Sequence, residues 1–303
     1  MISPLLGPHT EVSMECNPED ITPEKLARWR SFGIHRLSIG MQTLNPKFAH
    51  LLNRGCTTDY AQEILEEVRK ANWPSWSIDL IFALPEQSLD DLNKDLDAIL
   101  ELGVPHVSLY GLTWEEGTPF SRALAQGKMH AVSDELWRAQ YDLIRERLLS
   151  NGFEQYEVSN FAKPGHQSKH NLLYWSDAPY LGLGPSAHGY RFDGIRTRHV
   201  ADIAVYMNDP QVQTHIPSAE QQALDMLIGG IRSTSGLDSQ RLHVKTGMVI
   251  DPKRIRQLTQ QGLITVKKGR IIPTHDGFPL SDAIVDFLTK GLAAQPNYMP
   301  LLK

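Results

Sequence analysis

The chain has 303 residues, 41% of them hydrophobic and 21% charged, a composition typical of a globular protein with a sizeable core. Its net charge of −5 offers no electrostatic footprint for nucleic acid, and no run of eighteen apolar residues predicts a membrane span. The two cysteines, Cys16 and Cys56, argue against a disulfide framework. Together with an N-terminus that lacks the pattern of a signal peptide, they predict a cytoplasmic protein.

Apolar segments and amphipathic helical patterns alternate through the first half of the chain. The expected strands are 11–16, 35–42, 76–84 and 106–113. The expected helices are 22–32, 59–71, 88–102 and 133–150, and the last of these leads into a strand-like segment, 153–162. This alternation predicts an α/β fold of parallel βα units whose strands are buried on both faces.

The second half has a different pattern. Residues 163–200 are rich in loop signals, with neither helix period nor strand alternation over 169–190, and 201–218 resembles a connector. After it, two helices (219–231 and 252–260), a hairpin (263–274) and a final helix (281–291) predict a small winged-helix-like domain. We interpret the basic tip of that hairpin as a solvated turn, because no wider basic patch supports a DNA contact.

Polar residues stand at the carboxyl ends of the expected strands: Glu15, Gln42, Asp79 and Thr113. In closed βα architectures, ligands bind at this rim. Carboxylates and an amide suit a small polar ligand that carries an amine and ribose hydroxyls, and Arg54 adds a donor for a ligand carboxylate. The alternative is strand-end capping and helix salt bridges, which is the more economical interpretation for any one of these residues taken alone.

Taken together, several motifs resemble the HemW heme-chaperone branch of the radical SAM family, a close relative of the oxygen-independent coproporphyrinogen III oxidases. They are MECNPEDI, RLSIGMQ, LNRG, IDLIFALPEQ and HNLLYW, and the resemblance runs from about Glu11 to near the C-terminus. It implies a barrel of six βα units. It also implies contacts to S-adenosylmethionine from the side chains of Glu15, Gln42, Arg54 and Asp79, and from a backbone carbonyl at Thr113.

Two motifs of that family are absent from the chain: the CxxxCxxC that holds a [4Fe–4S] cluster and a GGGTP loop. We therefore expect an incomplete barrel, βα units three to six over residues 1–165, without the cluster and without radical chemistry. Such a barrel leaves the segment 11–16 as an unpaired edge that invites a second chain, as in a homodimer. A truncated gene model and a genuinely short paralogue both explain the missing motifs.

The segment HNLLYW has its own implication. In the resembling chaperones an HNxxY segment contacts heme, which implies heme contacts from His170, Asn171 and Tyr174, with His170 ligating the iron. His188 and His166 are further candidate ligands, and a structural histidine in a packed loop is the alternative. Gly182, Gly184 and Ala187 match the dinucleotide pattern G-x-G-x-x-A. We reject that interpretation because Pro185 prevents a clean helix start, and expect close backbone approach instead.

These features predict three regions: the partial barrel (1–165), an HNxxYW loop region with connector (166–218) and an accessory domain (219–303). The expected function is that of a heme-binding chaperone delivering heme to acceptor proteins. The alternatives are an oxygen-independent coproporphyrinogen III oxidase and an inert remnant.

Overall fold

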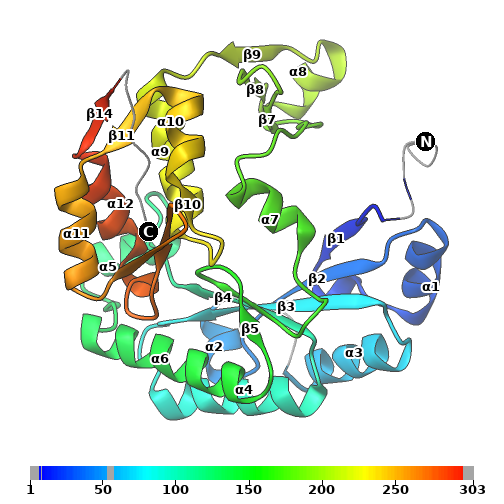
Figure 1. Cartoon of the computed structure of the whole chain (residues 1–303). Coiled ribbons are helices and arrows are strands. Elements are labelled where there is room, and N and C mark those ends of the chain that lie inside the picture. Colours follow the sequence, from blue (N-terminus) through cyan, green and yellow to red (C-terminus); the bar gives the residue numbers. More distant parts are fainter. Residues whose placement is uncertain (1–6, 8, 53–57, 296–303) are drawn as a thin grey trace. The chain divides into compact units, whose positions relative to one another are not determined.

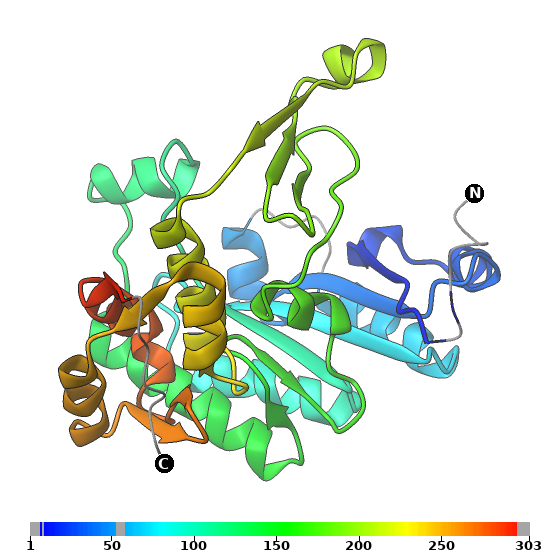
Figure 2. The ribbon, with the colours of Figure 1, turned by 45° about the horizontal axis from the view of Figure 1, so that its top comes forward.

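The computed structural model describes Gly7, residues 9–52 and residues 58–295. It divides the chain into two compact units, Met1–Ser168 and Lys169–Lys303. In the first unit, residues form a six-stranded sheet in the order β1-β2-β3-β4-β6-β5 (Figure 1). The parallel strands are β1 (Ser13–Cys16), β2 (Arg36–Gln42), β3 (Ser75–Phe82) and β4 (His106–Gly111). Figure 2 shows these blue-to-cyan strands running side by side. The prediction of parallel βα units is confirmed for these four strands.

The sequence predicted a single strand over residues 153–162, and this prediction is wrong. Two short strands, β5 (Glu154–Gln155) and β6 (Asn160–Ala162), pair antiparallel with each other, and β6 also pairs antiparallel with β4. The chain turns between them because the Glu157 carboxylate accepts a hydrogen bond from the backbone of Ser159 at 3.0 Å. A local acidic turn thus overrides the strand-like pattern.

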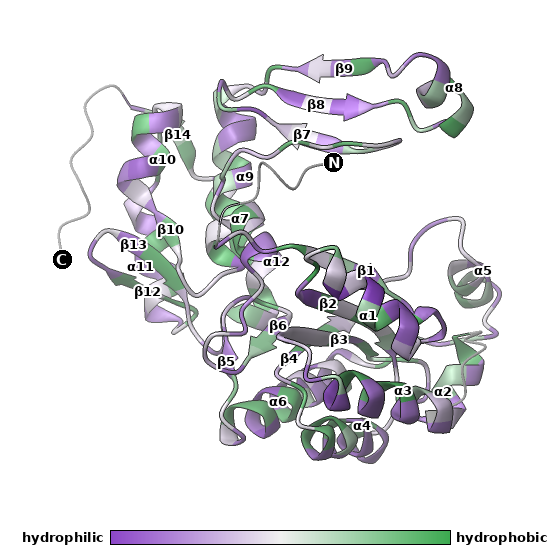
Figure 3. Ribbon diagram, turned by 90° about the vertical axis from the view of Figure 1, so that its right-hand side faces the viewer, coloured by the Kyte–Doolittle hydropathy of each residue, from purple (hydrophilic) through white to green (hydrophobic). Residues whose placement is uncertain are grey.

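The helices of this unit follow the sequence expectation closely. The four expected helices are α1 (Pro23–Ser31), α3 (Thr58–Lys70), α4 (Leu89–Leu102) and α6 (Asp134–Ser150), and α2 (Pro46–Leu51), α5 (Pro119–Ala125) and the 3-10 turn η2 (Pro18–Asp20) are additional. Caps set their ends: the Thr22, Ser88 and Ser133 hydroxyls accept backbone N–H bonds at the starts of α1, α4 and α6. Helices α3, α4 and α6 lie along one face of the sheet (Figures 1 and 3).

Side chains alternate along the central strands, and this alternation separates the two faces of the sheet. Leu37, Ile39, Ile78, Leu80 and Val107 are buried at 0–1% exposure, and the register aligns Ile39, Ile78 and Val107 across three strands. The opposite face carries a polar row: Ser38, Ser77, Asp79 and Ser108. The strands are therefore apolar on the face that the helices cover, and polar on the other.

The second unit begins with elements that the sequence did not predict. Residues Lys169–Trp175 form helix α7, although the segment was expected to be loop. A three-stranded antiparallel sheet follows, made of β7 (His188–Tyr190), β8 (Arg196–His199) and β9 (Val212–His215), with α8 (Ile203–Asn208) between the last two. The connector expected over 201–218 is thus largely structured. The strands of this sheet were missed because β8 and β9 are largely polar, and β9 is exposed throughout, so no hydrophobic alternation marks them (Figure 3).

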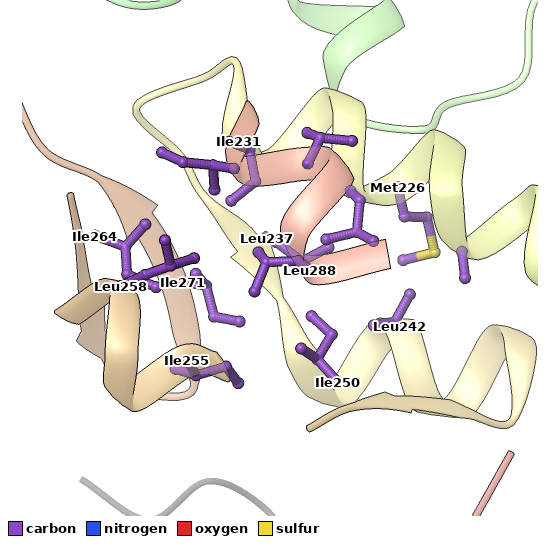
Figure 4. Close-up of a cluster of buried hydrophobic side chains, with 14 of the residues drawn as sticks. Met226, Ile231, Leu237, Leu242, Ile250, Ile255, Leu258, Ile264, Ile271 and Leu288 are labelled. Atoms are coloured by element: carbon purple, nitrogen blue, oxygen red, sulfur yellow. The ribbon is translucent and has the colours of Figure 1, made fainter. Parts of the chain in front are cut away.

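The rest of this unit packs around one hydrophobic cluster. Its elements are α9 (Ala219–Ile231), β10 (Leu237–Asp238), α10 (Ser239–Thr246), β11 (Met248–Ile250), α11 (Pro252–Gln260), β12 (Ile264–Lys267), β13 (Arg270–Pro273), η3 (Phe278–Leu280), α12 (Ser281–Thr289) and β14 (Leu292–Ala294). Ile231, Ile271 and Leu288 are fully buried in the cluster (Figure 4). The expected hairpin closes at Lys268 and Gly269, both with positive φ, as a tight two-residue turn requires.

No helix within the described part of the chain is long and apolar enough to cross a membrane.

Candidate functional site

Two predicted ligand residues of the first unit lie within electrostatic reach of each other. Glu15 pairs in register with Ser38, and the Ser38 hydroxyl lies 3.1 and 3.2 Å from the two carboxylate oxygens of Asp79. Burial raises the pKa of Asp79, hydrogen bonds from Ser38 and Ser108 oppose the rise, and the charge of Glu15 adds to it. The polar face of the sheet therefore gathers the two carboxylates with the hydroxyls of Ser38, Ser77 and Ser108.

The other residues predicted to contact the ligand are Gln42, Thr113 and Arg54, and they lie in different surroundings. Gln42 ends β2 at a register shift and has a φ of +70°, a left-handed conformation that turns the chain out of the ladder. Thr113 is exposed, two residues beyond the end of β4. Arg54 lies outside the described residues, as does Cys56. The structure thus brings Glu15 and Asp79 together and records no contact that joins Gln42 or Thr113 to them.

Sequence reasoning missed the serines around Asp79. Ser38 and Ser77 share a hydrogen bond of 2.9 Å between their hydroxyls, and Ser38 also contacts Asp79. The sequence contained a signal for these serines, because polar and apolar residues alternate in the strand segments RLSIG, WSIDL and HVSLY. Read as alternation, these segments predict a polar face on which Asp79 is solvated by hydroxyls rather than by a cation.

A second polar cluster in the first unit includes the backbone carbonyl of His166. The guanidinium of Arg36, buried at 3% exposure, donates to the Ser75 hydroxyl at 2.9 Å and to the backbone carbonyl of His166 at 3.0 Å. His106 lies beside them, with its Nε2 2.7 Å from the Tyr156 hydroxyl, and burial lowers its pKa well below the usual value. The backbone carbonyl of His166 therefore holds a buried arginine in place. This contact favours a structural role for His166.

The residues present do not fit a [4Fe–4S] cluster. Such clusters need grouped thiolates, and the sequence has two cysteines forty positions apart. Cys16 is half-buried, its thiol lies 3.8 Å from the Ser38 carbonyl, and burial raises its pKa to about 12, which disfavours a thiolate. Among the residues that the structure describes, no three His, Cys, Asp or Glu side chains are grouped to hold a metal ion.

In the second unit, helix α7 presents the HNxxY residues. His170 and Tyr174 are one helical turn apart, so their rings share a face, with centroids 4.9 Å apart and planes at 85°. The Tyr174 ring in turn meets the Tyr180 ring edge-on at 4.7 Å. Tyr174 is 46% exposed and Asn171 is half-buried beside it on the helix. The motif therefore forms an accessible aromatic surface.

Beside α7 lies a pocket of about 360 Å³. Its lining includes Tyr174, Trp175, Tyr180, His188, Tyr190 and Arg196, together with residues of α9. Sequence reasoning had noted the aromatic residues of this stretch and His188, but it missed Arg196, for which no motif gave a signal. A side-chain ion pair joins Arg196 to Asp225, and Asp177 pairs with Lys245 at the pocket's edge.

Two glycines let the walls of this pocket approach each other. A Cβ on Gly182 would lie 2.0 Å from the His188 carbonyl oxygen, and a Cβ on Gly229 in α9 would lie 2.5 Å from the Trp175 carbonyl oxygen. Close backbone approach is therefore confirmed for Gly182. It is wrong for Gly184, where a Cβ would meet nothing within 4 Å and the backbone has a positive φ of +113°. Two backbone hydrogen bonds between Tyr180 and Tyr190, of 2.7 and 2.8 Å, close the same loop.

Comparison with known proteins agrees with this architecture. Residues 3–99 match the model of the radical SAM superfamily. Among solved structures, the coproporphyrinogen III oxidase (HemN) of Escherichia coli, described as a radical SAM enzyme, covers 92% of this chain and 70% of its own, with a TM-score of 0.74 and 21% identity. At that identity the likeness is one of fold. The match places residues 3–99 in the radical SAM superfamily, a class that implies S-adenosylmethionine and a [4Fe–4S] cluster, and the solved structure agrees with it in fold.

Comparison with curated relatives narrows the assignment from a superfamily to one family. The heme chaperone HemW of Bacillus subtilis is 32% identical over 296 residues, which is 94% of this chain and 78% of that protein. The heme chaperone HemW of Mycobacterium tuberculosis is 32% identical over 93% of this chain and 72% of its own. The mitochondrial radical S-adenosyl methionine domain-containing protein 1 of Danio rerio is 40% identical over 59% of this chain and 40% of its own. The chain belongs to the HemW family.

Proposed function

We propose that the protein is a heme chaperone, which binds heme through α7 and passes it to heme-accepting proteins. The observation that carries this proposal is the aromatic surface of α7: a histidine and a tyrosine on one face of the helix, accessible and 4.9 Å apart. Imidazole and phenolate are both iron ligands in heme proteins, and flat rings suit a porphyrin face. The names of the relatives support the same cargo.

His170 is the proposed iron ligand, and Asn171 and Tyr174 are the proposed neighbouring contacts. The ring geometry supports this arrangement, because the edge of one ring against the other fixes the direction in which both side chains point. We place the activity in the cytoplasm, where a reducing environment suits a chain with two widely spaced cysteines.

Glu15, Gln42, Arg54, Asp79 and Thr113 form the proposed S-adenosylmethionine site. The support is the pair of carboxylates around Ser38, since carboxylates accept hydrogen bonds from an amine and from ribose hydroxyls. S-adenosylmethionine supplies a sulfonium group and, with a cluster, radical chemistry. In this proposal, the residues of the chain bind the polar groups of S-adenosylmethionine. The likeness to coproporphyrinogen III oxidase, being one of fold, does not favour that activity over the chaperone.

A hemin titration followed at the Soret band tests the proposal. The wild-type chain is expected to bind hemin saturably, His170→Ala to lose most of the affinity, and His166→Ala to keep it, since His166 serves Arg36 through its backbone. Equal affinities for the two variants would overturn the assignment to the HNxxY motif. The absence of saturable binding to the folded wild-type chain would overturn the chaperone function itself.

A further inference from the structure

The pocket beside α7 has a composition that the HNxxY motif does not account for. Three tyrosines, a tryptophan, a histidine and an arginine line it, and all of them belong to the second unit. Ligand pockets combine an apolar or aromatic wall with a few convergent polar groups, and a volume of about 360 Å³ lies at the lower end of their usual range. A pocket of this size holds one edge of a large planar ligand and leaves the other edge accessible, as a cargo that is later handed over requires.

We propose that this pocket seats the heme, with His188 as a second axial ligand of the iron and Arg196 as the partner of a propionate. The inference rests on the proposed function and adds the residues that hold the cargo beyond α7. It identifies the ligand class as a flat, carboxylate-bearing macrocycle with a central metal.

His188 is suited to ligation by its surroundings. It lies in β7, its side chain is exposed, and the structure gives its imidazole no hydrogen bond to any described residue. By contrast, His199 in the neighbouring strand directs its Nε2 to the Gly182 carbonyl at 3.1 Å and packs edge-on against Tyr206. An iron ligand must keep one ring nitrogen available. Of these two histidines in adjacent strands, His188 has an exposed side chain, whereas the one ring nitrogen that His199 leaves without a partner, Nδ1, is buried.

The aromatic wall is fixed before any ligand arrives. Tyr180 and Tyr190 are bridged through their backbones, and the Tyr174 ring packs edge-on against Tyr180. The ammonium of Lys245 lies 4.9 Å from the centre of the Tyr190 ring and also contacts its hydroxyl, while pairing with Asp177. Rings held in this way bind a porphyrin face without first losing rotamer freedom.

Arg196 supplies the charge complement. Its ion pair with Asp225 is partly exposed, with side-chain exposures of 36% and 44%. A guanidinium has five N–H donors, and one carboxylate uses at most two of them in a bidentate pair, so donors remain for a propionate at the pocket's mouth.

The test titrates hemin and metal-free protoporphyrin IX into the full chain and its variants. His188→Ala is expected to weaken hemin binding about tenfold or more and to change its ferric spectrum from low-spin to high-spin, while metal-free protoporphyrin binds as to wild type. Arg196→Gln is expected to weaken both ligands. The matched control is His215→Ala, an exposed histidine of β9 that contacts Gln221 and does not line the pocket.

The outcomes separate the two claims. If wild type and His188→Ala bind hemin with the same affinity and spectrum, the pocket assignment is wrong while the chaperone function stands. If His188→Ala weakens metal-free protoporphyrin as strongly as hemin, His188 does not ligate iron, and the assignment is likewise overturned. If the wild-type chain shows no saturable hemin binding, the proposed function fails, and the pocket assignment fails with it. Matching far-UV circular dichroism spectra establish that each variant is folded.

Discussion

At the scale of single residues, burial raises the pKa values of two carboxylates of this chain, those of Asp95 and Asp79. Asp95 in α4 is 2% exposed and accepts hydrogen bonds from the Thr43 hydroxyl and the Leu44 backbone N–H, both at 3.0 Å. Burial nevertheless raises its pKa to about 6, because two neutral donors do not replace the lost hydration. Asp79 shows the same competition on the polar face of the sheet, where two serines oppose the effect of burial.

The raised pKa of Asp95 predicts a pH-dependent stability. Between the unfolded pKa near 3.8 and the folded value near 6, the folded state keeps a proton that the unfolded state has released. The free energy of unfolding should therefore fall as pH rises from 4 to 6, by about 2 kcal/mol from this residue. Urea denaturation across that range checks this. Asp95→Asn should flatten the slope, and Asp90→Asn, an exposed residue of the same helix, should not. Equal slopes for wild type and Asp95→Asn would contradict the account.

Asp79 carries a prediction about ligand binding. Asp79→Asn should weaken S-adenosylmethionine binding by about tenfold or more, since it removes a charge-assisted acceptor worth about 1.5–3 kcal/mol. Because burial raises the pKa of Asp79, wild-type binding should also weaken on acidification at a higher pH than an ordinary carboxylate would require. Isothermal titration calorimetry measures both effects, with Asp90→Asn as control. Unchanged affinity in Asp79→Asn would remove this residue from the proposed site.

At the scale of elements, short segments were the hardest to predict. Helix α7 has seven residues, too few for a 3.6-residue period to be visible, and an isolated helix of that length is unstable in water. What holds it is tertiary: its C-terminal residue, Trp175, packs its carbonyl against Gly229 of α9. The sequence contained both partners, but no local pattern connects positions 54 residues apart.

This packing makes Gly229 a test of how α7 is supported. Gly229→Ala places a methyl group 2.5 Å from a backbone oxygen, a distance that forces one helix to shift. We expect a loss of about 1–3 kcal/mol in stability, despite the higher helix propensity of alanine, and weaker hemin binding. Chemical denaturation and the hemin titration measure the two effects. A variant as stable as wild type, with full hemin affinity, would show that α7 does not depend on this contact.

At the scale of the whole molecule, the elements that the sequence predicted are those marked by hydrophobic periodicity and by helix caps. The four parallel strands and the helices α1, α3, α4, α6, α9, α11 and α12 follow from such patterns. The antiparallel β5–β6 hairpin and the polar β7–β9 sheet do not, because turns and long-range pairing define them. For the candidate sites, motifs identified Glu15, Asp79 and His170. The alternation in RLSIG carried an unread signal for Ser38, while Arg196 became visible only when the fold placed it in one pocket with Tyr174 and His188.

A chaperone differs from a heme-storage protein in what happens after binding. A cargo seated by one edge in an open pocket remains accessible, so an acceptor can contact it before it leaves. Transfer should therefore depend on the acceptor, and not only on spontaneous release.

The most direct measurement of this claim mixes the hemin-loaded chain with increasing concentrations of an apo heme protein and follows the acceptor's Soret band. We predict a transfer rate that rises with acceptor concentration and exceeds the release rate measured with a passive heme scavenger. A rate that does not change with acceptor concentration and equals passive release would contradict the claim that this chain hands heme to its partners.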